Sequence, residues 1–97
     1  MVTSNKLESA IERRLVEEVK ALGGLCEKWT SGTLGWPDRI VVLFDGKIGF
    51  VELKAKGKKP RAMQRYRHKQ LKERGFKVYV IDDVKSIKGV LDEIQSS

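Results

Sequence analysis

The chain has 97 residues, of which 40% are hydrophobic and 34% are charged, and its net charge is +7. This length and composition predict one globular domain, residues 1–97, with a single modest core, and they exclude a membrane span or an apolar N-terminal signal. The single cysteine, Cys26, excludes an intramolecular disulfide, and no Cys/His cluster indicates zinc.

The pattern of apolar residues and turn signals predicts the order α-β-β-β-α-β-α. Two of the predicted strands are joined by Asp45-Gly46, the strongest hairpin signal in the chain. Both strands are apolar on both faces, so we expect them at the centre of a sheet flanked by helices. The predicted elements are a helix over 5–22, strands over 25–30, 39–44 and 47–55, a helix over 60–74, a strand over 76–81 and a helix over 84–94.

Two ionisable residues continue an apolar row on the strand over 47–55. Alternation places Glu52 and Lys54 on one face, where a buried carboxylate is costly without a balancing cation. A structural salt bridge between them is the simplest interpretation. Asp38 favours a different one, because it opens the partner strand just after a Gly-Trp-Pro segment that restricts the backbone.

Two carboxylates that converge beside a lysine suit Mg²⁺, which takes one or two carboxylates and keeps several waters. Such a water is a potential nucleophile, and the metal can neutralise charge that builds on a phosphate. Lys54 would then orient or activate the attacking water, or stabilise the charged phosphate.

This metal site requires one particular strand register. A two-residue turn at Asp45-Gly46 would pair residues whose numbers sum to 91, which sends Asp38 away from Glu52. A three-residue loop over 44–46, with Gly46 left-handed and a bulge, gives pairs that sum to 90 and sets Asp38 opposite Glu52.

The first helix offers a third carboxylate. Glu8 lies inside the apolar arc of the helix over 5–22, and Glu12 lies at the edge of that arc. Glu8 has an alternative role as a capping partner of Asn5. An inward carboxylate favours the metal site, so Glu8 is the expected third ligand and Glu12 is the fallback.

Positive charge is concentrated in residues 54–77. That segment holds eleven Lys and Arg residues against one acid, Glu73, so its net charge is +10 and that of the remaining chain is −3. A solvated face normally mixes signs, whereas a run of one sign points to a polyanion, most often nucleic acid. On the helix over 60–74, cations gather opposite a side that includes Met63 and Tyr66. The residues expected to contact DNA phosphates are Lys56, Lys58, Lys59, Arg61, Arg65, His68, Lys69 and Lys72.

Four sequence blocks, within about residues 7–82, carry a family resemblance. They are E-S-A-I-E-R-R-L-V…A-L-G-G, S-G-T-L-G-W-P-D-R-I-V-V-L, F-V-E-L-K-A and Q-R-Y-R-H-K-Q-L…G-F-K-V-Y-V-I. In this order they resemble the VRR-NUC (virus-type replication-repair nuclease) family of the PD-(D/E)XK nuclease superfamily. The resemblance implies a restriction-endonuclease-like α/β fold with a central mixed sheet, and a Mg²⁺- or Mn²⁺-dependent DNA endonuclease.

The resemblance also implies roles for individual residues. It gives metal-ligand roles to Glu8, Asp38, Glu52 and the Leu53 backbone carbonyl. Lys54 takes the catalytic lysine role, and Gln64 matches a glutamine that positions water or a phosphate. Trp36 stands where a smaller apolar residue is more usual, and it either packs or stacks on a splayed base.

The leading interpretation is a structure-selective endonuclease similar to Holliday-junction resolvases, because small standalone family members are typical of phage genomes and resemble those enzymes. The alternatives are a flap- or nick-directed nuclease, and a non-catalytic nucleic-acid-binding module on the same fold. A site-specific restriction nuclease is disfavoured because little chain remains for base readout. Two symmetric cuts predict a homodimer or a dimer-based oligomer, with the helices over 84–94 and 5–22 as candidate interfaces. We expect a phage or bacterial origin, a location in the host cytoplasm and no membrane partner.

Overall fold

The observed helices and strands follow the predicted order. The computed structural model describes the backbone of residues 4–96 and the side chains of residues 7–96. Two short 3₁₀ turns, η1 (Phe44–Gly46) and η2 (Val84–Ser86), lie between the longer elements. Among the described residues, no helix has the length and apolar character needed to cross a membrane. The longer elements are α1 (Ser4–Ala21), β1 (Leu25–Lys28), β2 (Arg39–Leu43), β3 (Lys47–Leu53), α2 (Ala62–Glu73), β4 (Lys77–Ile81) and α3 (Ile87–Gln95).

The four strands form one mixed sheet in the order β1-β2-β3-β4. β1, β2 and β3 pair antiparallel, and β4 pairs parallel with β3 after the crossover through α2. The two strands that are apolar on both faces are therefore central, as predicted. β3 ends at Leu53, so Lys54 follows the strand, where its N–H donates to the Ile81 carbonyl at 3.0 Å.

The connection between β2 and β3 sets the position of Asp38. It is the three-residue turn η1, and the strands pair Arg39 with Val51, so paired residue numbers sum to 90. The register that the metal interpretation requires is confirmed. Gly46 is left-handed as predicted, with φ of 71°, and Asp45 is left-handed too, with φ of 64°. Aspartate tolerates this conformation because its short polar side chain can bond locally.

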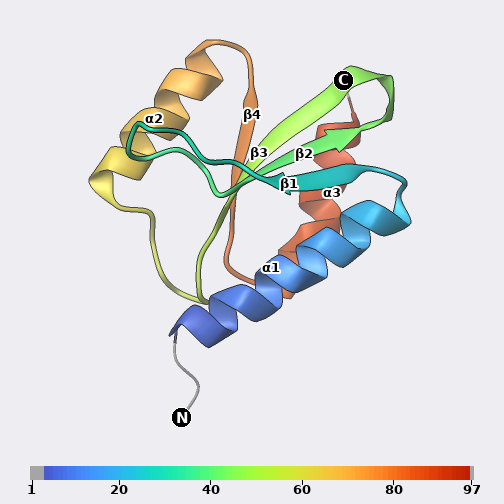
Figure 1. Cartoon of the computed structure of the whole chain (residues 1–97), viewed down its shortest axis with the longest axis horizontal. Helices are drawn as coiled ribbons and strands as arrows, with labels where there is room; N and C mark the ends of the chain where they lie inside the picture. The colour runs from blue at the N-terminus through green and yellow to red at the C-terminus, as the bar shows by residue number, and fades with distance from the viewer. Residues whose placement is uncertain (1–3, 97) are drawn as a thin grey trace.

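Helices cover both faces of the sheet (Figure 1). α1 and α3 pack on the face that carries Val51 and Leu53. α2 packs on the opposite face through Leu71, which contacts Phe50 and Val78. The apolar cluster on this second face has fewer residues, and the same face carries Glu52 near the end of β3.

The apolar side chains of α3, the C-terminal helix, are buried in the core. Ile87, Val90, Leu91 and Ile94 are at most 9% exposed. α3 approaches β3 so closely that a Cβ at Gly49 would lie 2.5 Å from Ile94. These four side chains cover the sheet face, whereas Val84, just before the helix, is 41% exposed. A dimer interface on this helix stays a prediction.

Candidate active site and metal centre

Asp38 lies directly before β2, and its carboxylate reaches the end of β3. Asp38 Oδ2 accepts a hydrogen bond from the Leu53 N–H at 2.8 Å. The Asp38 carbonyl accepts another from the Trp29 N–H at 2.9 Å, which ties it to the residue after β1. These two bonds fix both the backbone and the side chain of Asp38.

Glu52 is buried, with 1% of the residue exposed, and three side chains approach its carboxylate. The Gln64 Nε2–H donates to Oε2 at 2.9 Å, and Lys54 Nζ lies 3.5 Å from the same oxygen. On the other side, His68 Nε2 lies 3.5 Å from Oε1. A buried carboxylate is tolerated where cations and hydrogen-bond donors offset its desolvation, and this site supplies both.

Burial and two neighbouring acids raise the pKa of Asp38. Burial raises the pKa of Asp38 from 3.8 to about 6; the Leu53 N–H lowers it, whereas the charges of Glu52 and Glu8 and a hydrogen bond to Glu52 raise it. Like charges held close together resist simultaneous ionisation. Asp38, Glu52 and Glu8 are thus close enough to interact electrostatically.

Glu8 and Glu12 both line a pocket of about 300 Å³ that Asp38 also lines. Glu12 is already paired, because its Oε2 accepts from Arg39 Nε at 2.8 Å. Glu8 is thereby the better-placed carboxylate of α1, although its ligand role stays a prediction. The Asn5 side chain, its alternative partner, lies outside the described residues.

The residues present fit a divalent cation with oxygen ligands, but the full predicted set is not assembled. In the described part of the chain, no group of three or more His, Cys, Asp and Glu side chains is arranged to hold a metal ion. Asp38 interacts with Glu52 at the end of β3, and with Glu8 across the pocket that Asp38 and Glu8 both line. Glu52 Oε1 and His68 Nε2 are buried without a hydrogen-bond partner among the described residues.

Glu52 Oε1, which has only His68 Nε2 at 3.5 Å, belongs to a carboxylate that also interacts with Asp38. This pair of acids is the observation that favours a cation, because Mg²⁺ needs only one or two carboxylates and completes its shell with water. Leu53 lies between Glu52 and Lys54, and the ligand role of its carbonyl stays a prediction.

The inward face of α2 differs from the one that apolar periodicity predicted. His68 is only 6% exposed, and Gln64 points to Glu52 from one turn earlier, whereas Met63 and Tyr66 are exposed. The placement of His68 on the basic surface is therefore corrected. The reason is that this part of α2 faces Glu52 rather than an apolar core, so polar residues are turned inward.

The other residues expected to contact DNA are all exposed. Arg65, Lys69 and Lys72 line a second pocket, of about 600 Å³, between α2 and β4, together with Val80. His68 also lines this pocket, and its Nε2 lies 3.5 Å from Glu52 Oε1. The exposed cations are Lys56, Lys58, Lys59, Arg61, Arg65, Lys69 and Lys72.

Of the two roles considered for Trp36, the structure shows packing. Its ring lies 6.0 Å from Phe50 and 5.7 Å from Trp29, and the Arg67 guanidinium lies 5.9 Å from it. Trp29 is the more exposed of the two, at 38%. Sequence reasoning missed both Trp29 as a pocket residue and His68 as a partner of Glu52. The i, i+4 spacing of Gln64 and His68 was the available signal for the second.

Comparisons with known proteins agree with this architecture. No profile of a protein family matches the sequence. A protein of Acyrthosiphon pisum secondary endosymbiont phage 1 named "Putative nuclease p44" is 47% identical over 83 residues, which cover 82% of this chain and 89% of that protein. A solved structure described as "VRR_NUC domain" is 32% identical with a TM-score of 0.80, covering 88% of this chain and 94% of that one. The mixed sheet flanked by helices is thus the PD-(D/E)XK-like fold of that neighbour. The chain belongs to the VRR-NUC family of nucleases.

Proposed function

We propose that the protein is a divalent-metal-dependent DNA endonuclease that selects branched DNA, in the manner of a Holliday-junction resolvase. The observation that carries the proposal is the contact set of Glu52. A buried carboxylate with an unused oxygen lies beside Asp38, Lys54 and Gln64. Phosphodiester hydrolysis needs an activated water and a positive charge beside the phosphate, and this set can provide both.

Each residue has a distinct role in this proposal. Asp38 and Glu52 hold the metal, Glu8 and the Leu53 carbonyl add to its ligands, and Glu12 remains paired with Arg39. When bound, Mg²⁺ or Mn²⁺ neutralises charge on the phosphate and lowers the pKa of a coordinated water. Lys54 keeps its ammonium 3.5 Å from Glu52 and faces the attacking water or the phosphate.

Gln64 is positioned by the start of α2. Its Oε1 accepts from the Arg61 N–H at 2.8 Å, so its Nε2 is directed to Glu52. Gln64 therefore orients Glu52 and, through it, the reacting phosphate. The exposed cations of the α2 surface and of the loop before it contact the DNA backbone.

The inward-facing acids favour an enzyme over a non-catalytic binding module. Carboxylates beside a phosphate weaken binding unless a cation lies between them, so simple DNA binding gains nothing from a buried Glu52 next to Asp38. A flap- or nick-directed nuclease uses the same chemistry on a different substrate, and the substrate panel below separates the two.

The test is cleavage of four-way junction, flap, nicked duplex and linear duplex DNA, with Mg²⁺, Mn²⁺ or a chelator. Asp38→Ala and Glu52→Ala should abolish cleavage while DNA binding persists or tightens, because each removes a metal ligand and a negative charge. Asp92→Ala, an exposed acid on α3, is the matched control and should cleave normally. Near wild-type cleavage by both Asp38→Ala and Glu52→Ala would contradict their assignment as metal ligands. Cleavage of flap DNA but not of four-way junctions would identify flaps as the substrate.

A further inference from the structure

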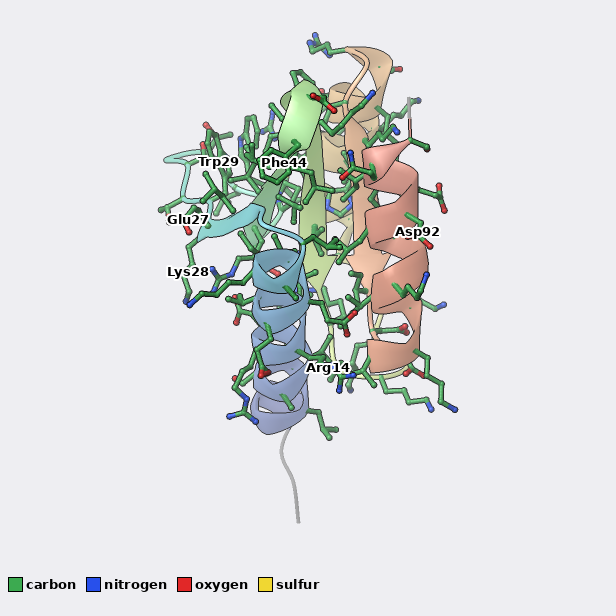
Figure 2. The ribbon with its side chains drawn as sticks, turned by 90° about the vertical axis from the view of Figure 1, so that its right-hand side faces the viewer. Arg14, Glu27, Lys28, Trp29, Phe44 and Asp92 are labelled. Atoms are coloured by element: carbon green, nitrogen blue, oxygen red, sulfur yellow. The ribbon has the colours of Figure 1, made fainter. Side chains whose placement is uncertain are left out.

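Trp29 brings an aromatic ring to the pocket that contains Asp38. It is 38% exposed and lines the cavity of about 300 Å³ together with Asp38, Glu8 and Lys28. Among the described residues that line this pocket, Trp29 is the one aromatic side chain. Figure 2 shows Trp29 and Lys28 on the same side of the molecule, at the end of β1.

Neighbouring residues hold the Trp29 ring in place. The backbone N–H of Trp29 donates to the Asp38 carbonyl at 2.9 Å, so the backbones of these two residues are held side by side. The ring centroid lies 5.7 Å from that of Trp36 and 5.8 Å from that of Phe50, in tilted and edge-on arrangements. A ring restrained on its inner side and open to a pocket loses little freedom when it binds a flat ligand.

We propose that Trp29 forms a stacking site for an unpaired nucleobase next to the phosphate that is cut. Bases inside a duplex are already stacked on their neighbours, so an exposed indole can accept only a base that is unpaired or splayed out. Such bases occur at junctions, flaps and bulges. The site therefore gives the protein a means of recognising branched DNA that does not depend on base sequence.

The charges around the pocket agree with a nucleotide ligand. Lys28 lies at its edge and can contact a phosphate, and Glu12 is neutralised by Arg39. Asp38 and Glu8 repel a phosphate unless a divalent cation is bound, so the stacking site rests on the cation binding of the proposed function and not on its cleavage step. The metal then fixes the phosphate, and Trp29 fixes the adjacent base.

The experiment compares three fluorescein-labelled DNAs by fluorescence anisotropy, with Ca²⁺ in place of Mg²⁺. One is a duplex with a single unpaired nucleotide, the second has an abasic site at that nucleotide, and the third is fully paired. Trp29→Ala should weaken binding of the first about 5- to 100-fold, as loss of one stacked base does, and leave binding of the abasic DNA unchanged. Trp29→Phe keeps a π-face and should retain most of the affinity.

Two variants control for folding and for general loss of surface aromatics. Trp29→Leu keeps apolar volume without a π-face, so it should bind like Trp29→Ala while melting like the wild type. Phe44→Ala removes an exposed ring, 65% accessible, from the opposite end of β2, and should change nothing.

Equal weakening on unpaired and abasic DNA, or no weakening at all, would overturn the stacking site. Cleavage with Mg²⁺ or Mn²⁺, compared between the wild type and Asp38→Ala, tests the proposed function separately. Cleavage without base-dependent binding rejects the stacking site alone. Base-dependent binding without cleavage rejects the nuclease function and leaves the stacking site standing.

Discussion

At the scale of single residues, the two acids of the site, Glu52 and Asp38, differ in the partners that offset their negative charge. Glu52 receives a hydrogen bond from Gln64 and has Lys54 nearby, so its negative charge has partners within the protein. Asp38 has one backbone donor, the Leu53 N–H, and two acidic neighbours. The side chains around Asp38 therefore supply less positive charge than those around Glu52, and a proton or a cation can supply it.

This shortage predicts a link between pH, divalent cations and stability. Because burial raises the pKa of Asp38 to about 6, the folded chain holds a proton between about pH 4 and pH 6 that the unfolded chain releases. The stability from Asp38 is complete below that window and is lost as pH rises through about 6. Saturating Mg²⁺ or Mn²⁺ should therefore raise the Tm near pH 7.5, by about 4–8 °C per kcal/mol of binding free energy, and much less near pH 5.

Differential scanning calorimetry at the two pH values measures this effect. Asp38→Asn should lose both the pH dependence and the response to cations. An equal rise in Tm at both pH values, or a rise that persists in Asp38→Asn, would place the cation elsewhere.

Lys54 is expected to act in the chemical step rather than in metal binding. Lys54→Ala should lower the cleavage rate at saturating metal by about 100-fold or more, as loss of a positioned catalytic group does, with metal affinity changed only a few-fold. Single-turnover kinetics with metal titration separates the two quantities. Lys20→Ala, an exposed lysine on α1 outside the DNA-contacting surface, is the control. A variant that loses metal affinity but turns over normally at saturating Mg²⁺ would contradict the role of Lys54.

At the scale of elements, α2 serves the site with two different faces. Its inner face directs Gln64 and His68 to the two oxygens of Glu52 from successive turns. Its outer face exposes Arg61, Arg65 and Lys69. One helix thereby connects the carboxylate that holds the metal with the surface that binds the DNA backbone.

The inner face predicts that His68 positions Glu52. His68→Ala should lower the free energy of unfolding by about 1–3 kcal/mol, because a buried group beside a charge is lost, and should also weaken metal affinity. His68→Gln should restore part of the metal affinity. Lys69→Ala, the next and exposed residue, should stay within about 0.5 kcal/mol of the wild type. Chemical denaturation and isothermal titration with Mn²⁺ give the two readouts, and unchanged metal affinity in His68→Ala would limit His68 to packing.

The outer face predicts a general contribution to DNA affinity. Replacing Arg61, Arg65 and Lys69 together by Ala should weaken binding to all DNA shapes alike. The slope of log affinity against log salt should become shallower by about 2–3, because up to three phosphate contacts are lost. Alanine substitution of Lys20, Lys85 and Lys88, which are also exposed, removes the same charge from other elements. Unchanged affinity and salt dependence would identify the α2 surface as merely solvated.

At the scale of the whole molecule, one chain presents one site, whereas resolving a four-way junction takes two symmetric cuts. We propose that the active species is a homodimer, because two-fold pairing presents two identical sites. The core already uses Ile87, Val90, Leu91 and Ile94 of α3, so pairing through this helix would use its exposed residues.

Light scattering at micromolar concentration should give twice the mass of the chain, and two copies should bind each four-way junction. A protein that remains monomeric in solution and binds a junction as a single copy would rule out paired resolution. A flap- or nick-directed nuclease would then be the better function.

The sequence by itself determined the order of elements and the central strands, and it limited Asp38 and Glu52 to two relative arrangements. These follow from local rules. Apolar periodicity distinguishes helices from strands. Asp45-Gly46 allows either a two-residue turn, with paired residue numbers that sum to 91, or a three-residue loop over 44–46, with a sum of 90, and the structure has the second. The charge pattern alone also predicted that Arg65, Lys69 and Lys72 of α2 are exposed. The same prediction was wrong for His68, which is buried.

Only the tertiary structure decided which face of α2 turns inward and which tryptophan reaches the pocket. Periodicity assumes that the inward face is apolar, and α2 breaks this rule because it packs over the buried charge of Glu52, which polar Gln64 and His68 stabilise. Trp29 and Trp36 have equal hydrophobicity in the sequence. Their different exposure arises because Phe50, Arg67 and Trp29 surround Trp36, whereas Trp29 stands at the end of an edge strand beside Asp38. Contacts between residues distant in sequence fix such differences, and no local pattern records them.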